Sequence, residues 1–359
     1  MFLQRLHMQK FRCFSDKVVE FDAPLTIISG LNGQGKTSII EAVYYLSYFK
    51  SFRSHVLHDL IQSTESSFFL KGDFWNEQDS ITHTIQIGHA QHKKSVKFDQ
   101  RPLHSFKQML HVFQTVSLTE DDLDLIKGSP AARRAFMDHA VILQMPEKID
   151  IYTDFRKILH QRNTFLSTIN PNFFDRLQYE IWTQQLVDSS QKIQNLRIQV
   201  LQEVELRVNQ LLCEYFDDIY QIALEYHPKH DYNNVILHLD HFLPQEMYQK
   251  RSLFGAHLDD LVFQIEDKKA RIFASRGQQK LIILLAKWAL ATLSTSKISP
   301  IFLMDDFISD FDTVRLQHLI NLFSVSKNQV ILTVPYLDTT MQSLFEHANV
   351  KFMPIKTTL

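Results

Sequence analysis

The feature that most constrains this chain is the octapeptide Gly30-Leu31-Asn32-Gly33-Gln34-Gly35-Lys36-Thr37, which fits the pattern G-x-x-x-x-G-K-[ST]. The apolar run 25–28 precedes it, and residues 38–46 follow with helical spacing. A strand, a glycine-rich loop and a helix in this order form the setting in which the pattern binds phosphate, because backbone N–H groups and a helix N-terminus face the anion. A chance glycine turn is the alternative, and the flanking strand and helix argue against it.

Each position of this loop has an expected contact with ATP. Lys36 would reach the β- and γ-phosphates, and the hydroxyl of Thr37 would ligate Mg²⁺. The residues expected to bind the nucleotide here are Gly30, Leu31, Asn32, Gly33, Gln34, Gly35, Lys36, Thr37 and Ser38. The chain has only 8 glycines in 359 residues, and three of them lie in this loop, which indicates that the backbone geometry requires them there.

Composition narrows the class of protein. A chain of 359 residues can bury a large core and suggests two domains, or one domain with a large insertion. The net charge of −2 argues against bulk attraction to nucleic acid, so any DNA contact must come from a local patch. Two cysteines, no signal-peptide pattern and no long apolar run predict a cytoplasmic protein with no membrane partner.

The first part of the chain reads as strands around the loop. Short strands are expected at 2–9, 17–21 and 25–29, and a helix at 36–48. The basic loop 50–54 is interpreted as a solvated connector in preference to a phosphate or DNA contact. Period-two alternation then predicts antiparallel strands, at 68–74, 81–87 and 95–99.

A basic cluster accompanies the last of these strands. It comprises Lys93, Lys94, Lys97 and Arg101. Such a cluster is usually a solvated face, and DNA contact is the alternative.

A helical block follows. Ser129 is placed to cap a helix that has Pro130 at its first position. Long apolar periodicity predicts further helices at 152–166 and 174–216, before strand character returns at 222–226 and 235–239. The expected domains are therefore the N-terminal part of an ATPase lobe at 1–128, an inserted helical lobe at 129–220, and the C-terminal part of the ATPase lobe at 221–359.

The second half of the site is predicted near the C-terminal end. Ser275, Gly277 and Gln278 open the strongly apolar helix 281–293, where hydroxyl and N–H donors suit an anion. Asp305 and Asp306 end the apolar strand 300–304. Asp305 would hold Mg²⁺ through water, and Asp306 would act as general base toward the attacking water.

Two more residues complete the pattern. Asp312 lies in a turn before a helix that starts near residue 313, and Thr333 ends the apolar strand 328–333, where a γ-phosphate sensor is expected. This order of motifs predicts an α/β fold: a P-loop ABC-type ATPase head, with mixed sheets and flanking helices, and an inserted, mainly helical second lobe. In that class the Ser275 helix faces the nucleotide of a second copy, so ATP is expected to drive formation of a homodimer.

Several stretches carry a narrower resemblance over essentially the whole chain. They are Lys10-Phe11-Arg12, residues 41–46, Ser51-Phe52-Arg53, residues 127–134 (KGSPAARR), Gln161-Arg162-Asn163, residues 182–186, residues 255–261 (GAHLDDL), residues 277–279 and the pair 305–306. With these the sequence resembles the bacterial RecF family of DNA repair ATPases. The stretches KGSPAARR and GAHLDDL are far more specific than the ATPase motifs. Ala256 and Leu258 stand where the family usually has Pro and Arg, which removes a fixed charge.

The resemblance implies a head like that of Rad50 with a helical second lobe in place of a coiled coil. It implies ATP-dependent dimerisation, slow DNA-stimulated ATP hydrolysis, and loading of RecA at gapped or junction DNA, single-stranded next to double-stranded, together with RecO and RecR. The sequence does not identify the DNA-contact surface, and charge alone suggests Lys71, Lys127, Arg133 and Arg134.

Competing functions fit less well. A transporter nucleotide-binding subunit shares the ATPase motifs but has no use for KGSPAARR, a Rad50- or SMC-type head would need long coiled coils, and a small-molecule kinase shares only the phosphate loop. A nucleotide-gated scaffold with negligible turnover stays open as the alternative, because Asp306 is a weaker base than the Glu that most ABC enzymes use.

Overall fold

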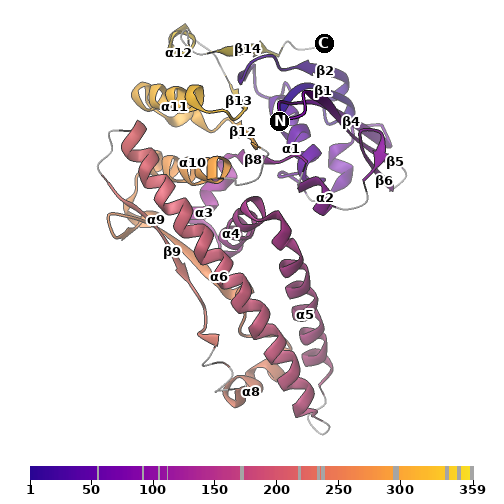
Figure 1. The fold of residues 1–359 in the computed structure, drawn as a ribbon, viewed down its shortest axis with the longest axis vertical. Coiled ribbons are helices and arrows are strands. Elements are labelled where there is room, and N and C mark those ends of the chain that lie inside the picture. The colour runs from indigo at the N-terminus through magenta and orange to yellow at the C-terminus, as the bar shows by residue number, and fades with distance from the viewer. Residues whose placement is uncertain are drawn as a thin grey trace. The chain divides into compact units, whose positions relative to one another are not determined.

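The computed structural model describes residues 1–54, 56–90, 93–103, 106–110, 112–169, 174–216, 220–232, 235, 239–293, 299–335, 339–345 and 349–355. The chain divides into two compact units (Figure 1). Unit 1 comprises 1–123, 208–219 and 276–359, and unit 2 comprises 124–207 and 220–275. In the described part of the chain, no helix combines the length and the apolarity needed to cross a membrane.

A five-stranded parallel sheet forms the centre of unit 1, in the order β14-β3-β13-β12-β8. Its strands are β3 (Leu25–Ser29), β8 (Thr115–Leu118), β12 (Ile301–Asp305), β13 (Val330–Val334) and β14 (Val350–Pro354). The strands β3 and β13 are buried at every residue, as expected for a parallel sheet that is covered on both faces.

Helices cover this sheet. α1 (Lys36–Tyr48) packs against β8, β12 and β13, and α10 (Arg276–Leu293) packs against β8 and β12 from the other side (Figure 1). The remaining helical elements of unit 1 are η1 (Leu57–Leu60), α2 (Phe106–Leu110), η2 (Glu120–Leu123), η6 (Ile308–Asp310), α11 (Thr313–Val325) and α12 (Thr339–Leu344).

A second, antiparallel sheet of unit 1 has the order β2-β1-β4-β5-β6-β7. It consists of β1 (Phe2–Phe11), β2 (Phe14–Glu20), β4 (Ser67–Asn76), β5 (Ile81–Ala90), β6 (Lys93–Phe98) and β7 (Arg101–Pro102). One face of it joins α1 in a shared hydrophobic core. Alternation of apolar and polar residues produces this one-sided burial, and the strands expected here from the sequence are present.

Unit 2 combines helices with a small sheet. Its helical elements are α3 (Asp124–Lys127), α4 (Pro130–Gln144), η3 (Pro146–Lys148), α5 (Ile149–Thr168), α8 (Leu239–Gln249), η5 (Ala256–Leu258) and α9 (Ala270–Phe273). Its sheet contains β9 (Ile222–His227), β10 (Asp260–Ile265) and β11 (Lys268–Lys269). The 40-residue helix α6 (Arg176–Tyr215) contributes residues to both units.

Two sequence expectations differ from this arrangement. Residues 221–275 were expected to complete the ATPase lobe, whereas 220–275 group with the helical unit. The physical reason is that β9 and β10 pair with each other and β10 packs on α4, so these strands form a sheet of their own. Ser129 is at the N-cap position of α4, but its side chain makes no capping hydrogen bond.

The strand expected at 235–239 falls mainly outside the described residues. Of its five positions only Val235 and Leu239 are described, and Leu239 begins helix α8.

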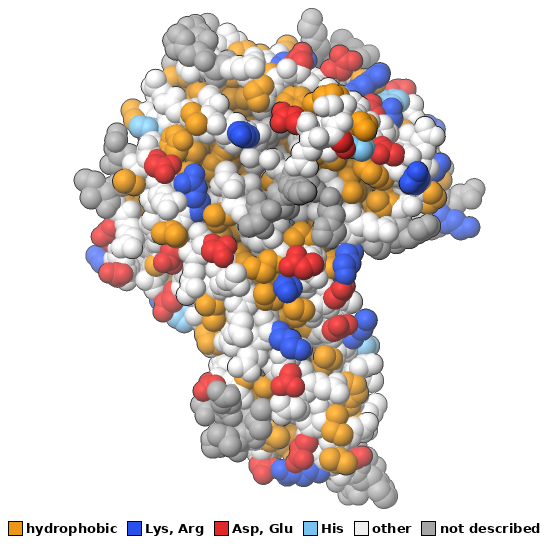
Figure 2. All heavy atoms as spheres, in the orientation of Figure 1, with side chains coloured by type: hydrophobic (Ala, Val, Ile, Leu, Met, Phe, Trp, Pro, Cys, Tyr) orange, Lys and Arg blue, Asp and Glu red, His pale blue; other side chains and the backbone are white. Residues whose placement is uncertain are grey.

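Surface charge matches the near-neutral composition. On the face shown in Figure 2, acidic and basic side chains are interspersed over the molecule. On this face a nucleic-acid contact has to be sought in a local group of side chains, because the surface is not uniformly basic.

Candidate nucleotide-binding site

The glycine-rich loop connects β3 to the first turn of α1, as expected. Gly33 and Gly35 have φ values of +83° and +96°, in the left-handed region that favours glycine. A Cβ at Gly35 would lie 2.7 Å from the sulfur of Cys13 and against the ring of Phe14. The loop backbone is therefore held close to the β1–β2 turn in a conformation that only glycine adopts without strain.

Side chains of the loop fold back on its own backbone. The ammonium of Lys36 donates to the carbonyl oxygens of Gly30 and Leu31, at 2.6 and 3.1 Å. The side-chain oxygen of Gln34 accepts from the N–H of Leu31 at 2.7 Å. These contacts keep Lys36, which is 7% exposed, inside the curve of the loop, where a phosphate-binding amine is needed.

The predicted residues separate between two hollows that flank the loop. A cavity of about 590 Å³ is lined by Asn32, Gly33, Gly35, Lys36, Thr37 and Ser38, together with Asp305 and Asp306. Gly30, Leu31 and Gln34 line a different hollow beside β14. The structure thus places the basic and hydroxyl groups of the loop on the same side as the two acids.

The side chains of Thr37, Asp305 and Thr333 meet at one edge of the parallel sheet, where β12 and β13 end and α1 begins. One carboxylate oxygen of Asp305 accepts a hydrogen bond from the Thr37 hydroxyl at 2.9 Å and another from the Thr333 hydroxyl at 2.8 Å. The order β3-β13-β12 explains the meeting, because parallel strands present their carboxyl ends at one edge. Hydroxyl and carboxylate oxygens are ligands that Mg²⁺ prefers, so this donor set fits the ion.

Asp306 has an unusual backbone and a shifted acidity. Its φ is +51°, and its N–H donates to the Thr333 hydroxyl at 2.9 Å. Burial raises the pKa of its carboxyl, and the neighbouring carboxylate of Asp305 raises it further, while Lys36 acts in the opposite direction. A carboxyl with a raised pKa next to the phosphate loop is suited to accepting a proton.

Thr333 was expected to sense the γ-phosphate. Its side chain is fully buried. Its hydroxyl donates to the carboxylate of Asp305, the last residue of β12, and accepts from the N–H of Asp306. These contacts make it a residue that positions Asp305 and Asp306.

Sequence reasoning missed the arginines of this cavity. Arg12 and Arg53 line it, and Arg12 makes a two-pronged ion pair with Glu41 of α1, at 2.8 and 2.6 Å. Glu41 is completely buried, and Arg53 lies 3.8 Å from the same carboxylate. The loop 50–54 is therefore more than a solvated connector. In the sequence these arginines belong to the stretches Lys10-Phe11-Arg12 and Ser51-Phe52-Arg53, which we used only as signs of family resemblance. These stretches could have indicated that both arginines belong to the site.

The residues of the second motif lie apart from this cavity. Among the described residues that line it, none is Ser275, Gly277, Gln278 or Asp312. Asp312 caps α11, since its carboxylate accepts from the N–H of Arg315 at 2.9 Å. Gly277 is in the first turn of α10, and a Cβ there would lie 3.2 Å from the guanidinium of Arg315.

A buried lysine joins three segments of the chain close to Asp305 and Asp306. Lys280 of α10 is fully buried and contacts the carboxylates of Glu120 and Asp310, the second at 2.9 Å. It also donates to the carbonyl oxygen of Phe307 at 3.1 Å and lies over that ring. Lys280 therefore connects the first turns of α10 to the segment after β8 and to the turn after β12.

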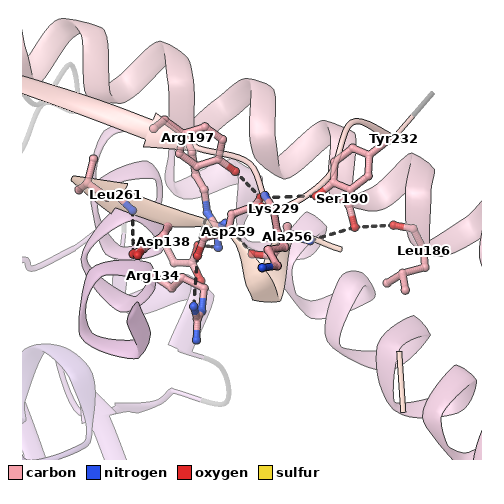
Figure 3. Close-up of polar contacts among 12 residues, drawn as sticks. Arg134, Asp138, Leu186, Ser190, Arg197, Lys229, Tyr232, Ala256, Asp259 and Leu261 are labelled. Atoms are coloured by element: carbon pink, nitrogen blue, oxygen red, sulfur yellow. Dashed lines mark hydrogen bonds and ion pairs between the residues drawn. The ribbon is translucent and has the colours of Figure 1, made fainter. Parts of the chain in front are cut away.

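The two most family-specific stretches meet in unit 2 (Figure 3). Arg133 of α4 makes a two-pronged ion pair with Asp260, at 2.7 and 2.9 Å, and Arg134 donates to the carbonyl oxygen of Asp259. Arg197 of α6 pairs with Asp138 and donates to the carbonyl oxygen of Ala256.

This network bears on the four basic residues suggested as DNA contacts. Arg133 and Arg134 are engaged within the protein, and Lys71 pairs with Asp73 at 3.1 Å. Lys127 is exposed. KGSPAARR and GAHLDDL therefore stabilise unit 2, which is a structural reason for both to occur together.

The fold and the phosphate-loop geometry define the class: this is an ABC-type P-loop ATPase head with a mainly helical second unit. The family described as RecF/RecN/SMC N terminal domain matches residues 2–354. Relatives named DNA replication and repair protein RecF include that of Natranaerobius thermophilus, 31% identical over 339 residues, 89% of this chain and 88% of the relative. That of Desulfitobacterium hafniense is 29% identical over 346 residues, 94% of each chain.

Solved structures agree with this assignment of the fold. A structure of the recombination mediator RecF with ATP has a TM-score of 0.83 at 22% identity, covering 94% of this chain and 93% of that one. The Smc head domain of Pyrococcus furiosus has a TM-score of 0.58 at 15% identity, covering 98% and 93%. The chain belongs to the RecF/RecN/SMC N terminal domain family and, within it, to the RecF family.

Proposed function

We propose that this protein is an ATP-dependent DNA-binding protein of recombinational repair and replication restart. The observation that carries the nucleotide part is the meeting of Thr37, Asp305 and Thr333 beside the phosphate loop. The names of the relatives, DNA replication and repair protein RecF, support the DNA part.

In this proposal the loop holds ATP by its triphosphate. Backbone N–H groups of residues 33–38 and the ammonium of Lys36 bind the β- and γ-phosphates. Thr37 and Asp305 hold Mg²⁺, which neutralises phosphate charge when it is bound. Arg12 and Arg53 line the same cavity and add positive charge.

Asp306 is the general base of the proposed hydrolysis. Its carboxylate accepts the proton of the attacking water, and Thr333 keeps it oriented through the backbone bond. Asp305 and Asp306 lie at the same edge of the sheet but have different tasks in this proposal. Asp305 holds the metal, and Asp306, whose pKa is raised, accepts the proton.

Completion of the site requires a second copy of the chain. Ser275, Gly277 and Gln278 open α10 with hydroxyl and N–H donors, and Asp312 starts α11 nearby in sequence. We propose that these residues contact the ATP held by the partner. ATP then binds the dimer more tightly than the monomer and stabilises the homodimer.

The dimer would act on DNA where single-stranded and double-stranded segments meet. There it would help to load RecA, with RecO and RecR as partners, and DNA would stimulate slow ATP hydrolysis. A solved structure of RecF with ATP, described as a recombination mediator in the RecFOR pathway, supports this assignment. The second candidate, a nucleotide-gated scaffold with negligible turnover, is favoured by Asp at position 306 in place of Glu.

Light scattering tests the proposal. The wild type and Asp306→Asn are measured with Mg²⁺-ATP and with Mg²⁺-ADP, each with and without a gapped DNA duplex. A monomer with ADP and a dimer with ATP is expected, and the dimer should last longer in the variant. A protein that remains monomeric with ATP and DNA would contradict the dimer, and ATP turnover that does not respond to DNA would favour the scaffold.

A further inference from the structure

The outward face of the antiparallel sheet of unit 1 carries a hollow, and the strand pairing shows which residues line it. Met8, Leu70, Ile87 and Val96 are paired across β1, β4, β5 and β6, and all four are buried in the core. The next row along the same strands is Gln9, Phe69, Gly88 and Ser95, which therefore points to the opposite face. These four residues line a cavity of about 580 Å³.

Gly88 has no structural reason to be glycine. Its φ is not in the left-handed region, and a Cβ built on it would meet nothing within 4 Å. Glycine within a strand reduces stability and often marks a place where a ligand approaches closely. The chain has only 8 glycines, and the other one with open space around it is Gly33 of the phosphate loop. The absent side chain at position 88 thus keeps the floor of the cavity open.

The lining of this cavity combines an aromatic ring with hydroxyl groups and amines. Phe69 lies next to Gly88 on the floor, and the rim includes Ser15, Ser67, Ser95, Lys10 and Lys93. The acid on the rim, Asp16, is held by His7 at 2.7 Å and by Gln9 at 3.2 Å.

Lysines extend beyond the cavity on the same face. The pair Gln86 and Lys97 lies two residues along the strands from the pair Gly88 and Ser95, so Lys97 is on the same outward side of β6. Lys93 and Lys97 are exposed, and neither makes an ion pair with an acid among the described residues. Lys10, in contrast, is paired with Glu65 at 2.8 Å. Two unneutralised cations on one strand therefore flank the aromatic floor.

We infer that this face of the sheet binds a single strand of DNA, with a base in the cavity over Phe69 and the adjoining phosphates near Lys93 and Lys97. This inference rests on the proposed DNA function and assigns a surface to it. An aromatic platform beside a row of cations is the arrangement that binds single strands with little sequence preference. The hydroxyl groups of the rim supply hydrogen bonds to sugar, phosphate or base.

Filling the cavity tests the inference. Gly88→Val introduces a β-branched side chain into open space, so the strand should form at least as well as before. The matched control is Thr82→Val, at the other end of β5 and outside the cavity. Affinity for a fluorescent oligothymidylate is measured by anisotropy with Mg²⁺-ATP, and ATP binding and the melting temperature are measured beside it.

Loss of one base contact should weaken binding of the oligonucleotide about five- to hundredfold in Gly88→Val. The affinity of Thr82→Val, and ATP binding by both variants, should not change. In Lys93→Gln/Lys97→Gln the slope of log affinity against log salt should fall by about 1 to 2.

The outcomes separate the two proposals. A wild type that binds the oligonucleotide as tightly as Gly88→Val does would overturn the inference and leave the DNA function standing. A wild type that binds neither single-stranded nor gapped DNA in any nucleotide state would overturn the DNA function itself. Photocrosslinking of an oligonucleotide carrying 5-iododeoxyuridine should label the segment 67–76, and labelling confined to unit 2 would likewise contradict the assigned surface.

Discussion

The hydroxyl of Thr37 and the carboxylate of Asp305 are 2.9 Å apart, although 268 residues separate them in the sequence. The contact links the start of α1 to the end of β12, and Thr333 donates to the same carboxylate oxygen. The pair proposed to hold Mg²⁺ is therefore assembled by the sheet, and its geometry depends on β13, the strand between β3 and β12.

Thr333→Val should separate chemistry from binding. The substitution removes a hydroxyl that contacts Asp305 and the backbone of Asp306 but keeps the shape of the side chain. Loss of hydrogen bonds to charged groups predicts that the rate constant of ATP hydrolysis falls about tenfold or more. ATP affinity, measured by titration calorimetry, should change much less, and Thr333→Ser should restore turnover. Equal losses in both variants would show that the hydroxyl is not what matters.

Gly35→Ala should disable the phosphate loop without unfolding the protein. The φ of +96° and the approach of Cys13 and Phe14 leave no room for a methyl group. The loop must therefore shift, and we expect ATP affinity to fall about five- to 150-fold, since strain of this kind costs about 1 to 3 kcal/mol. Gly88→Ala is the control, because its methyl group meets nothing. An unchanged affinity in Gly35→Ala would contradict the close approach of the β1–β2 turn.

Lys280→Met should destabilise unit 1. Lys280 is fully buried and pairs with the carboxylates of Glu120 and Asp310, and the variant removes this cation from both. Because these carboxylates are 42% and 40% exposed, water compensates them in part, and we expect a loss of about 1 to 2 kcal/mol in the free energy of unfolding, below the cost of a fully buried pair. Urea denaturation measures it. Arg276, which is 61% exposed, also pairs with Glu120 and Asp310, at 3.4 and 3.0 Å. Arg276→Ala should therefore cost less than half as much.

Asp260→Asn should alter how unit 2 responds to acid. Burial acts to raise the pKa of Asp260, but hydrogen bonds from Arg133 and the backbone outweigh it, so the pKa lies below its ordinary value of 3.8. A lowered pKa stabilises the folded state above 3.8, and this contribution is lost as pH falls through the folded-state value.

Hydrogen exchange of the amides of α4 and β10 measures this dependence. The variant should exchange faster than the wild type at pH 7, and the difference should shrink toward pH 3, after correction for intrinsic exchange rates. A difference that stays constant between these pH values would mean that the ionised carboxylate of Asp260 contributes nothing.

Local sequence patterns predicted the nucleotide loop and the strands around it. The loop, α1, β12 and α10 could be placed because each combines apolar periodicity with a motif of fixed spacing. Thr37 and Asp305 were both predicted to hold Mg²⁺, and the structure brings their side chains to 2.9 Å from each other.

Other features depend on tertiary pairing that no local pattern specifies. The strand at 222–226 was recognised, but its partner β10 was not, so its sheet was assigned to the wrong unit. Arg12 and Arg53 look like ordinary surface cations in the sequence, and only the buried carboxylate of Glu41 brings them to the cavity. The burial of Thr333 and its contacts with Asp305 and Asp306 also could not be predicted from its position near a strand end.

The position of β3 has a consequence for biosynthesis. The strand that precedes the phosphate loop is made within the first 30 residues, yet both of its neighbours, β13 and β14, come from residues 330–334 and 350–354. A nascent chain on the ribosome therefore carries the loop for most of translation without the strands that hold it in place. We expect a chain that ends before β13 to lack the strand neighbours that position the loop, and therefore to bind nucleotide more weakly than the full sequence does.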